Sequence, residues 1–351
     1  MGHHDVASVG GSRCAVRAGR NSAGVLMTTT TEREAVTRWS AAGGEELRDE
    51  VLGRLLAGGS LNDLGLGERD GRVGLRGLRL PPPERLHAYR KRGWVIEELG
   101  GLLVLRGLHL ADLDLSGGSL EGLRFFATTV ANCRFDDARC QDWRLWATDV
   151  EHCSFVGADL RKAVLGSWYE NRENVWRHVN FTGANLRGIV STAATFEDCD
   201  FSDAHLAKID FQSSGFVRCR FAGLLREVIF YDHGHKTGKA KPNRMIDIDF
   251  SGADLRMVEF RHLDLDRVTF PNDASHLVVK NYRCVLERAL SALAADESSR
   301  ARRLCAVLEL RRRWAGAGQV MGVFNERDFV KMGNEDEARY VAVRDESAAA
   351  R

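Results

Sequence analysis

The sequence contains little proline and no long hydrophobic run. Only 5 of its 351 residues are proline, which argues against a Pro-rich, low-complexity chain. The longest aliphatic run, residues 102–105, is far shorter than the roughly 18 residues that a membrane-spanning helix needs. The first 30 residues contain no apolar stretch of signal-peptide length. We therefore expect a cytoplasmic protein with no membrane association.

A charge excess of either sign is also missing. The chain has 50 Lys and Arg against 49 Asp and Glu, for a formal charge of +1. This balance argues against a general nucleic-acid binder or a polybasic membrane protein, since both need a strong positive field. With 44% apolar residues, the chain can build one large or two ordinary domains.

The eight cysteines form no C-x-x-C pair, which argues against a structural zinc site. A disulfide framework is typical of short secreted chains, which this is not. The spacing is informative instead, because Cys133 precedes Cys153 by the same interval that separates Cys199 from Cys219. We expect reduced thiols that occupy equivalent, stacked positions of a repeating structure.

What the sequence does contain is a period of five. Every fifth residue is apolar from Leu105 to Leu165, from Trp176 to Phe221 and from Met245 to Phe270, with Ser191 as the exception. The residue two before each of these is usually small or β-branched, and the other three are mostly polar. A period of five fits neither the 3.6 of a helix nor the 2 of a flat strand. It predicts a short-period solenoid in which both apolar positions point inward.

The clearest copies of the repeat are Gly-Ala-Asp-Leu-Arg at 157–161 and 252–256, and Gly-Ala-Asn-Leu-Arg at 183–187. These segments resemble the A-(D/N)-L-x-x pattern of the pentapeptide-repeat protein family. The resemblance implies an all-β solenoid, a right-handed quadrilateral β-helix with four pentapeptides in each coil. The repeats would then form about seven coils and a rod of about 34 Å at the usual strand spacing.

The sequence suggests four regions. Residues 1–30 are expected to be a disordered tail, and Met27 is an alternative start to Met1. Residues 31–102 are expected to form a helical N-terminal cap, with a helix over 32–57, and an irregular first coil. Residues 103–271 carry the β-helix, and residues 272–351 are expected to form an α-helical C-terminal cap. One helical stripe there is expected to run from Val278 to Leu293 and a second to follow Asp296. The family resemblance also suggests a homodimer through the C-terminal helices.

Two breaks interrupt the five-residue period, at 166–174 and 231–244. Because they lie about three coils apart, we expect them on the same or neighbouring faces, where they would form one partner-binding patch. Its aromatic residues are Trp168, Tyr169 and Tyr231, and its basic residues are Lys236, Lys239, Lys241 and Arg244. Aromatic anchors flanked by cations are typical of binding hot spots. The alternative is that the aromatics seal the break and the second loop is an idle insertion.

Catalytic or metal chemistry is weakly represented. Asp232, His233 and His235 offer an incomplete metal-ligand set, and no nucleophile with its base is apparent. We therefore expect a non-catalytic scaffold that needs no cofactor and binds an unidentified protein. One alternative, implied by the resemblance, is a DNA mimic that binds and protects DNA gyrase or another topoisomerase. The other is an enzyme with a metal site at His233 and His235. The nearly balanced charge of the repeats disfavours a phosphate mimic.

Overall fold

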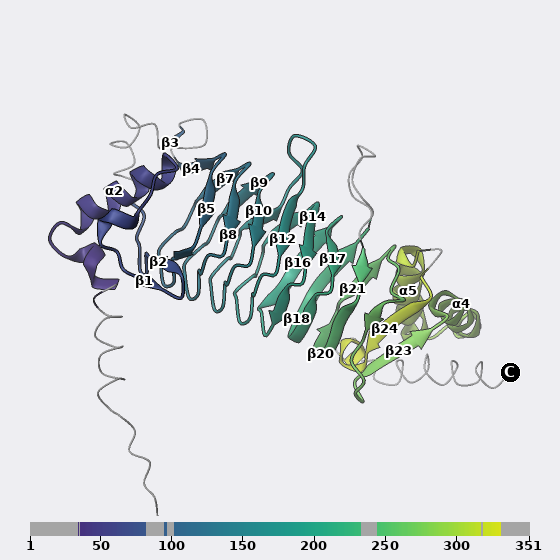
Figure 1. Ribbon diagram of the computed structural model, residues 1–351. Coiled ribbons are helices and arrows are strands. Elements are labelled where there is room, and N and C mark those ends of the chain that lie inside the picture. Colours follow the sequence, from purple (N-terminus) through teal and green to yellow (C-terminus); the bar gives the residue numbers. More distant parts are fainter. Residues whose placement is uncertain are drawn as a thin grey trace, which may run out of the picture.

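The structure is a computed structural model that describes residues 34, 36–81, 95–96, 102–232, 244–316 and 319–330. Its main body is a rod of stacked, parallel β-strands, with helices at both ends (Figure 1). No helix among the described residues has the length and apolar character to cross a membrane.

The rod advances by one strand spacing for every four pentapeptides. Leu105 pairs in register with Phe125, and Phe125 pairs with Leu145. The pairings between successive coils are parallel, so each turn of the chain lies on the one before it. The chain builds four walls, which we number from their first centre residues: wall 1 from Leu105, wall 2 from Leu110, wall 3 from Leu115 and wall 4 from Leu120.

Walls 1 and 2 carry most of the regular strands. Wall 1 contains β4 (Leu102–Arg106), β7 (Arg124–Phe126), β9 (Arg144–Trp146), β11 (Val164–Gly166), β13 (Val190–Thr192), the end of β16 (Leu206–Gln212), the end of β18 (Arg220–Tyr231) and β21 (Glu259–Arg261). Wall 2 contains β5 (His109–Ala111), β8 (Thr129–Ala131), β10 (Asp149–Glu151), β12 (Asn174–Arg177), β14 (Ala194–Glu197), β17 (Gly215–Val217) and β19 (Met245–Ile246).

Walls 3 and 4 are joined largely by single bridges. Asp114 pairs with Arg134 on wall 3, and Ser119 pairs with Arg139 on wall 4. The longer strands β16, β18 and β20 bend across a corner and continue these walls. The remaining strands of the rod are β1 (Glu68–Arg69), β2 (Arg72–Gly74), β3 (Val95–Ile96), β6 (Leu113–Asp114), β15 (Asp200–Ser202), β20 (Ile248–Arg256) and β22 (Val268–Thr269).

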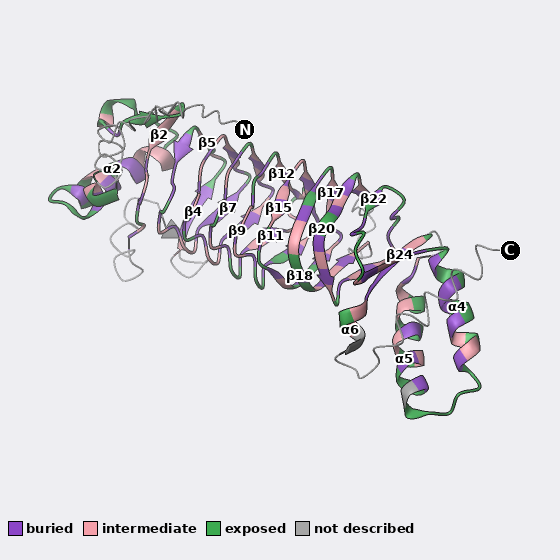
Figure 2. Ribbon diagram, turned by 90° about the horizontal axis from the view of Figure 1, so that it is seen from below, coloured by how far each residue is buried: buried purple, intermediate pink, exposed green. Residues whose placement is uncertain are grey.

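The centre residues point inward and stack in columns, as the period of five predicts. On wall 3, Phe181 stacks on Phe201 at 4.9 Å between ring centroids, and Phe201 stacks on Phe221 at 4.8 Å. Every centre residue of the three series is buried, including Ser191, whose hydroxyl lies 3.0 Å from that of Ser214. Figure 2 shows buried residues recurring from strand to strand along the rod. The inward placement is therefore confirmed.

The paired cysteines are stacked as expected. The Cys133 amide donates to Sγ of Cys153 at 3.4 Å, and all cysteines among the described residues are free. The hydrogen bond with Cys153, followed by burial, raises the pKa of Cys133. Burial, followed by the hydrogen bond with Cys219, raises the pKa of Cys199. These thiols are small buried hydrophobes, not nucleophiles.

At the N-terminal end, the expected helix over 32–57 is shorter than predicted. Helix α2 spans Gly44–Leu56 and is separated from the 3-10 turn η1 (Arg38–Ser40) by Gly43, which has a left-handed φ of 79°. A second 3-10 turn, η2, spans Asn62–Leu64. Val51 and Leu52 of α2 are buried in the same apolar core as the rod. A cavity of about 50 Å³ remains between Leu52, Leu78 and Leu120.

The sequence predicts a purely α-helical C-terminal region, but the structure also contains two strands there. Val278 lies in strand β23 (His276–Lys280), not in a helix, and β23 pairs antiparallel with β24 (Met321–Asn325). Neither strand alternates between buried and exposed residues, so the sequence of β23 and β24 could not be told from the apolar stripe of the helix that follows β23. Two helices lie between the strands, α4 (Tyr282–Leu293) and α5 (Ser299–Trp314), and α6 (Glu326–Val330) follows β24. The helix expected after Asp296 is thus confirmed.

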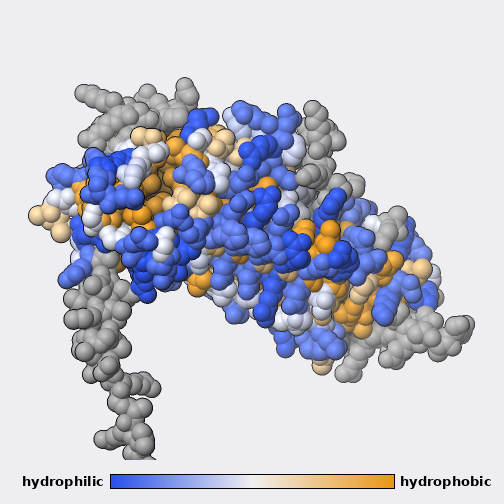
Figure 3. All heavy atoms as spheres, in the orientation of Figure 1, coloured by the Kyte–Doolittle hydropathy of each residue, from blue (hydrophilic) through white to orange (hydrophobic). Residues whose placement is uncertain are grey.

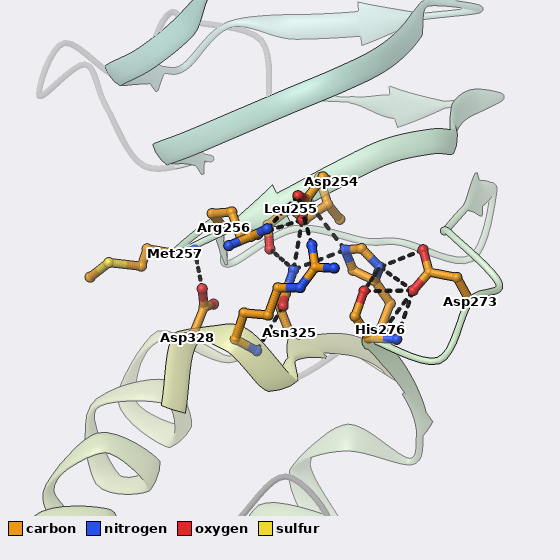
Figure 4. A network of polar contacts seen from close by, with 10 residues as sticks. Asp254, Leu255, Arg256, Met257, Asp273, His276, Asn325 and Asp328 are labelled. Carbon is orange, nitrogen blue, oxygen red and sulfur yellow. Dashed lines mark hydrogen bonds and ion pairs between the residues drawn. The ribbon is translucent and has the colours of Figure 1, made fainter. Parts of the chain in front are cut away.

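A buried polar network joins this C-terminal region to strand β20 (Figure 4). His276 accepts hydrogen bonds at Nε2 from the Leu255 amide at 3.0 Å and from Nδ2 of Asn325 at 3.1 Å. Its Nδ1 lies 3.0 Å from Asp273. Because two donors face Nε2, the proton of the neutral ring must sit on Nδ1 and point to Asp273.

Candidate functional site

Both breaks in the repeat interrupt the same corner of the rod, between walls 1 and 2. Elsewhere this corner needs only two residues, such as Ala127 and Thr128 between β7 and β8, with Ala127 in the left-handed region at φ 46°. The first break lies between β11 and β12 and the second between β18 and β19. Strands β12, β14, β17 and β19 are successive neighbours, so the breaks lie three coils apart. The expectation that they share a face is confirmed.

The first break is a small hairpin whose ends are firmly fixed. Tyr169 and Arg172 exchange two backbone hydrogen bonds of 2.9 Å, and Glu170 and Asn171 between them have positive φ angles. This conformation is typical of a tight two-residue hairpin turn. Nη2 of Arg172 reaches Asp149 on wall 2 at 2.8 Å.

Asn174 closes the gap beneath this hairpin. Its side chain is fully buried; Oδ1 accepts from the Thr148 amide at 3.0 Å, and Nδ2 donates to the carbonyls of Leu145 and Leu165 at 2.9 and 3.0 Å. These bonds satisfy backbone groups that the insertion would leave without partners. Nε1 of the buried Trp176 donates to the same Leu165 carbonyl at 3.0 Å, so Asn174 and Trp176 together close the break.

Tyr169 of the first break lies against wall 1. The ring of Tyr169 packs edge-on against Phe126 at 5.7 Å, and Phe126 stacks on Trp146 at 4.4 Å. The guanidinium of Arg106 lies 4.5 Å from the centre of the Phe126 ring. We call Arg106, Phe126, Trp146 and Tyr169 the Trp146 cluster. Trp168 and Tyr169 are half-buried, so part of each ring meets solvent.

Tyr231 is on the same wall but has different neighbours. Its ring lies 5.9 Å from His262 and 6.0 Å from Trp314 of α5. Arg261 covers the Trp314 ring at 4.4 Å. The structure therefore places Tyr231 beside the C-terminal region, whereas Tyr169 packs toward the N-terminal coils. The two aromatic groups share a wall and pack against different neighbours.

The second break is described only at its ends. Asp232 is half-buried and its amide donates to the Arg261 carbonyl at 3.1 Å; Arg244 is exposed and its carbonyl accepts from the Phe216 amide at 2.6 Å. Lys236, Lys239, Lys241, His233 and His235 lie outside the described residues, as does the tail 1–30. Within the described part of the chain, no three His, Cys, Asp or Glu side chains gather in a metal-binding arrangement.

Charged side chains on wall 2 neutralise one another between coils. Arg177 binds Glu151 at 2.7 Å and Glu197 at 3.1 Å, one coil on either side. Arg218 binds Asp198 at 2.7 Å, and the hydrogen bond from Arg218 lowers the pKa of that carboxyl. The acids of this wall thus alternate with arginines instead of forming a continuous negative surface.

Sequence reasoning missed Arg106, Phe126 and Trp146. The available signal was their position, directly after a centre residue, where the repeat normally places a polar side chain. An aromatic residue there on two successive coils indicates an outward stack. Figure 3 shows a largely hydrophilic visible surface on which hydrophobic side chains gather at the α2 end and in smaller patches along the rod.

Comparison with known proteins supports the repeat assignment. Residues 177–212 match the family described as pentapeptide repeats (8 copies). No curated protein matches the sequence significantly. Among solved structures, QnrB1, a plasmid-mediated fluoroquinolone resistance protein, is 18% identical over 45% of this chain and 81% of its own, with a TM-score of 0.21.

Two further solved structures are similar to part of the chain. A pentapeptide repeat protein from the Arabidopsis thaliana thylakoid lumen is 16% identical over 45% of this chain and 72% of its own, with a TM-score of 0.18. Rfr23 from the cyanobacterium Cyanothece is 12% identical over 48% of this chain and 87% of its own, with a TM-score of 0.14. The matched repeats, together with the register of the parallel strands and the buried aromatic columns, show that this chain contains pentapeptide repeats.

Proposed function

We propose that this chain is a non-catalytic interaction protein that binds a protein partner at the corner between walls 1 and 2. The observation that carries the proposal is the Trp146 cluster. It is a stack on the outer side of wall 1 in which the buried Phe126 ring lies between Trp146 and the exposed Arg106, beside a hairpin that stands at an otherwise tight corner. Aromatic residues and arginine are the side chains most enriched in binding hot spots.

The rod is a suitable support for such a site. Phe126 and Trp146 belong to strands that are held by backbone hydrogen bonds to adjacent coils, and the hairpin of Tyr169 is closed by its own backbone hydrogen bonds and tied to wall 2 by Arg172. Binding to a wall of this kind orders few flexible groups, which reduces the entropic cost of association. The proposal includes the second break, with Tyr231, Lys236, Lys239, Lys241 and Arg244 as further contacts.

The same proposal covers the finer architecture. We infer a right-handed, four-sided β-helix of about seven coils, given four pentapeptides per strand spacing. Its ends would be capped by α2 and by the C-terminal region, because an open solenoid end exposes apolar surface and strand edges. Burial of Val51, Leu52 and Val323 in the core of the rod supports both caps.

The alternative of DNA mimicry receives less support from the charges. A phosphate mimic needs a continuous negative field, whereas the acids of wall 2 are paired with arginines at 2.7 to 3.1 Å. We expect the purified protein to leave gyrase supercoiling unchanged, with and without a fluoroquinolone. Protection of gyrase in that assay would replace the scaffold proposal by the mimic.

Site-specific cross-linking tests the proposed corner. A photoactivatable residue at Tyr169 is expected to give a discrete cross-linked species in the cells from which the protein comes. The same residue at Ser251, exposed on wall 3, is the matched control. Adding Trp146→Ala is expected to remove the Tyr169 product without unfolding the rod. Equal cross-linking at Tyr169 and Ser251, or no discrete product at Tyr169, would contradict binding at this corner.

A further inference from the structure

Wall 4 carries a ladder of arginines along the rod. The three clean repeats noted in the sequence all place their last residue there, as Arg161, Arg187 and Arg256. Strand pairing adds Arg226, which lies opposite Arg256, while Ala207 lies opposite Arg226. The row directly beside this ladder, two residues earlier in each repeat, contains in order Asp159, Asn185, His205, Leu224 and Asp254.

The arginines at the two ends of the ladder are neutralised by this second row. Nε and Nη2 of Arg161 bind Asp159 at 2.9 and 2.7 Å, and the same atoms of Arg256 bind Asp254 at 2.6 and 2.7 Å. The hydrogen bond from Arg256 lowers the pKa of Asp254. Each of these pairs carries no net charge toward a partner.

The three coils between them lack this acid. Arg187 donates only to the neutral Asn185, at 3.1 Å. Arg226 has Leu224 in the equivalent place and approaches Glu227 no closer than 4.0 Å. Lys208, at the adjoining corner, is exposed and has no carboxylate within 4 Å among the described residues. The middle of wall 4 therefore carries three cations without a bound carboxylate, with Asp203, Asp210 and Glu227 at its rim.

Exposed aliphatic side chains lie on and beside the same surface. Leu224 is 49% exposed within it, and Val190, which follows Arg187 around the corner, is also 49% exposed. They are two of the few large hydrophobic side chains that are exposed in the described part of the chain. Leu224 and Val190 can therefore add apolar contact to a surface whose main feature is its positive charge.

We propose that Arg187, Lys208, Leu224 and Arg226, with Val190 beside them, form a docking surface for an acidic protein segment that carries aliphatic side chains. Charge complementarity selects the acidic partner, and Leu224 and Val190 provide apolar contact. A nucleic acid fits less well, because three cations neutralise few phosphates and His205 offers a single small ring for base stacking. The surface lies on wall 4, separate from the corner proposed above, and its test does not depend on that site.

The probe is a short fluorescein-labelled peptide of alternating Glu and Leu, followed by fluorescence anisotropy with the full chain. We expect saturable binding that weakens as salt is added and is absent for the Gln–Leu peptide. Asn185→Asp with Leu224→Asp restores the acid found at both ends of the wall, so this variant should fold. We expect it to reduce affinity at least about tenfold, since it neutralises two cations and removes the aliphatic contact.

Two matched variants complete the experiment. Reversing Arg187, Lys208 and Arg226 to Glu is expected to abolish peptide binding. Reversing Lys280, Arg288 and Arg303, which are exposed in the C-terminal region, changes the net charge equally and should leave binding nearly unaffected. Equal loss in both triple variants would overturn the proposal. So would tighter binding of an oligonucleotide than of the peptide, or self-association of the chain that the Asn185→Asp/Leu224→Asp variant abolishes.

Discussion

The interior of the rod and its junction with the C-terminal region are held together by different physical means. In the rod, Phe181, Phe201 and Phe221 stack in a column with no polar partner. At the junction, His276 and Asn325 hold β20 through directional hydrogen bonds. The stability of the apolar column depends on how well its side chains fill space and does not change with pH. The stability of the junction depends on the hydrogen-bonding atoms of its side chains and on their protonation. The two regions should therefore fail under different perturbations.

The largest expected effect is in the column. Phe201→Ala removes a fully buried ring that stacks on both sides and should destabilise the protein by about 3–5 kcal/mol. Phe211→Ala should act similarly. The measurement is chemical unfolding followed by circular dichroism. Thr182→Ala, on the outer wall, is the control, and an unchanged unfolding midpoint for Phe201→Ala would contradict the inward stacking.

The junction should respond less strongly and locally. Nδ2 of Asn325 donates to the Leu255 carbonyl at 2.8 Å and to Nε2 of His276. Asn325→Ala removes this donor from both acceptors. Unsatisfied buried groups of this kind cost about 1–3 kcal/mol. Hydrogen exchange should show faster opening of β23 and β24 while the middle of the rod remains protected. Equal loss of protection in both regions would mean that they do not unfold separately.

Acid should distinguish the two regions further. The pKa of Asp273 is lowered by hydrogen bonds from Ser275 and then from His276. Because its folded pKa lies below the unfolded value, the stabilisation is complete above the ordinary carboxyl pKa of about 4 and is lost as the pH falls below it. The effect is small, since Asp273 is largely exposed. The melting temperatures of the native chain and of Asp273→Asn should therefore become more similar below that pH. If their difference stays constant across this pH range, the Asp273 carboxylate does not cause the acid-dependent loss of stability.

The smallest expected effect is that of a reductant on the rod. The stacked thiols, including Cys133 with Cys153, should be reduced, so adding reductant should not change the unfolding midpoint. A thiol reagent should label the exposed Cys284 quickly and Cys133, Cys140 and Cys199 only after unfolding, because burial raises the pKa of Cys140 and contributes to that of the other two. Fewer than eight thiols in denaturant without reductant would show a disulfide.

The sequence predicted the fold well where the five-residue repeat continues. The period of five identified the buried face of every coil, and the spacing of the breaks placed both at one corner. It was a poor guide where the chain leaves the repeat. Strands β23 and β24 pair antiparallel across two helices, and neither strand shows a pattern that distinguishes it from the apolar stripe of a helix. Val278 was misassigned for this reason.

The candidate site was only partly visible for a related reason. Trp168 and Tyr169 stood out because they interrupt the period. Phe126 and Trp146 do not interrupt it, and differ from other repeats only in placing an aromatic side chain at an outward position. Which residues meet across coils depends on the register, and an insertion shifts it: Val130 pairs with Val150, but Val150 pairs with Trp176. The contact between Tyr169 and Phe126 therefore needed the structure.

The corner between walls 1 and 2 has a practical consequence for engineering. At two points the chain departs from this corner for extra residues and then resumes the same stack, as the pairing of Phe216 with Met245 shows. The corner therefore tolerates foreign sequence without a change in the coils on either side. Peptides grafted between β7 and β8 and between β9 and β10, at Ala127 and Ala147, would be displayed side by side at the strand spacing of about 4.8 Å. The chain would then serve as a molecular ruler on which two epitopes can be presented at chosen separations.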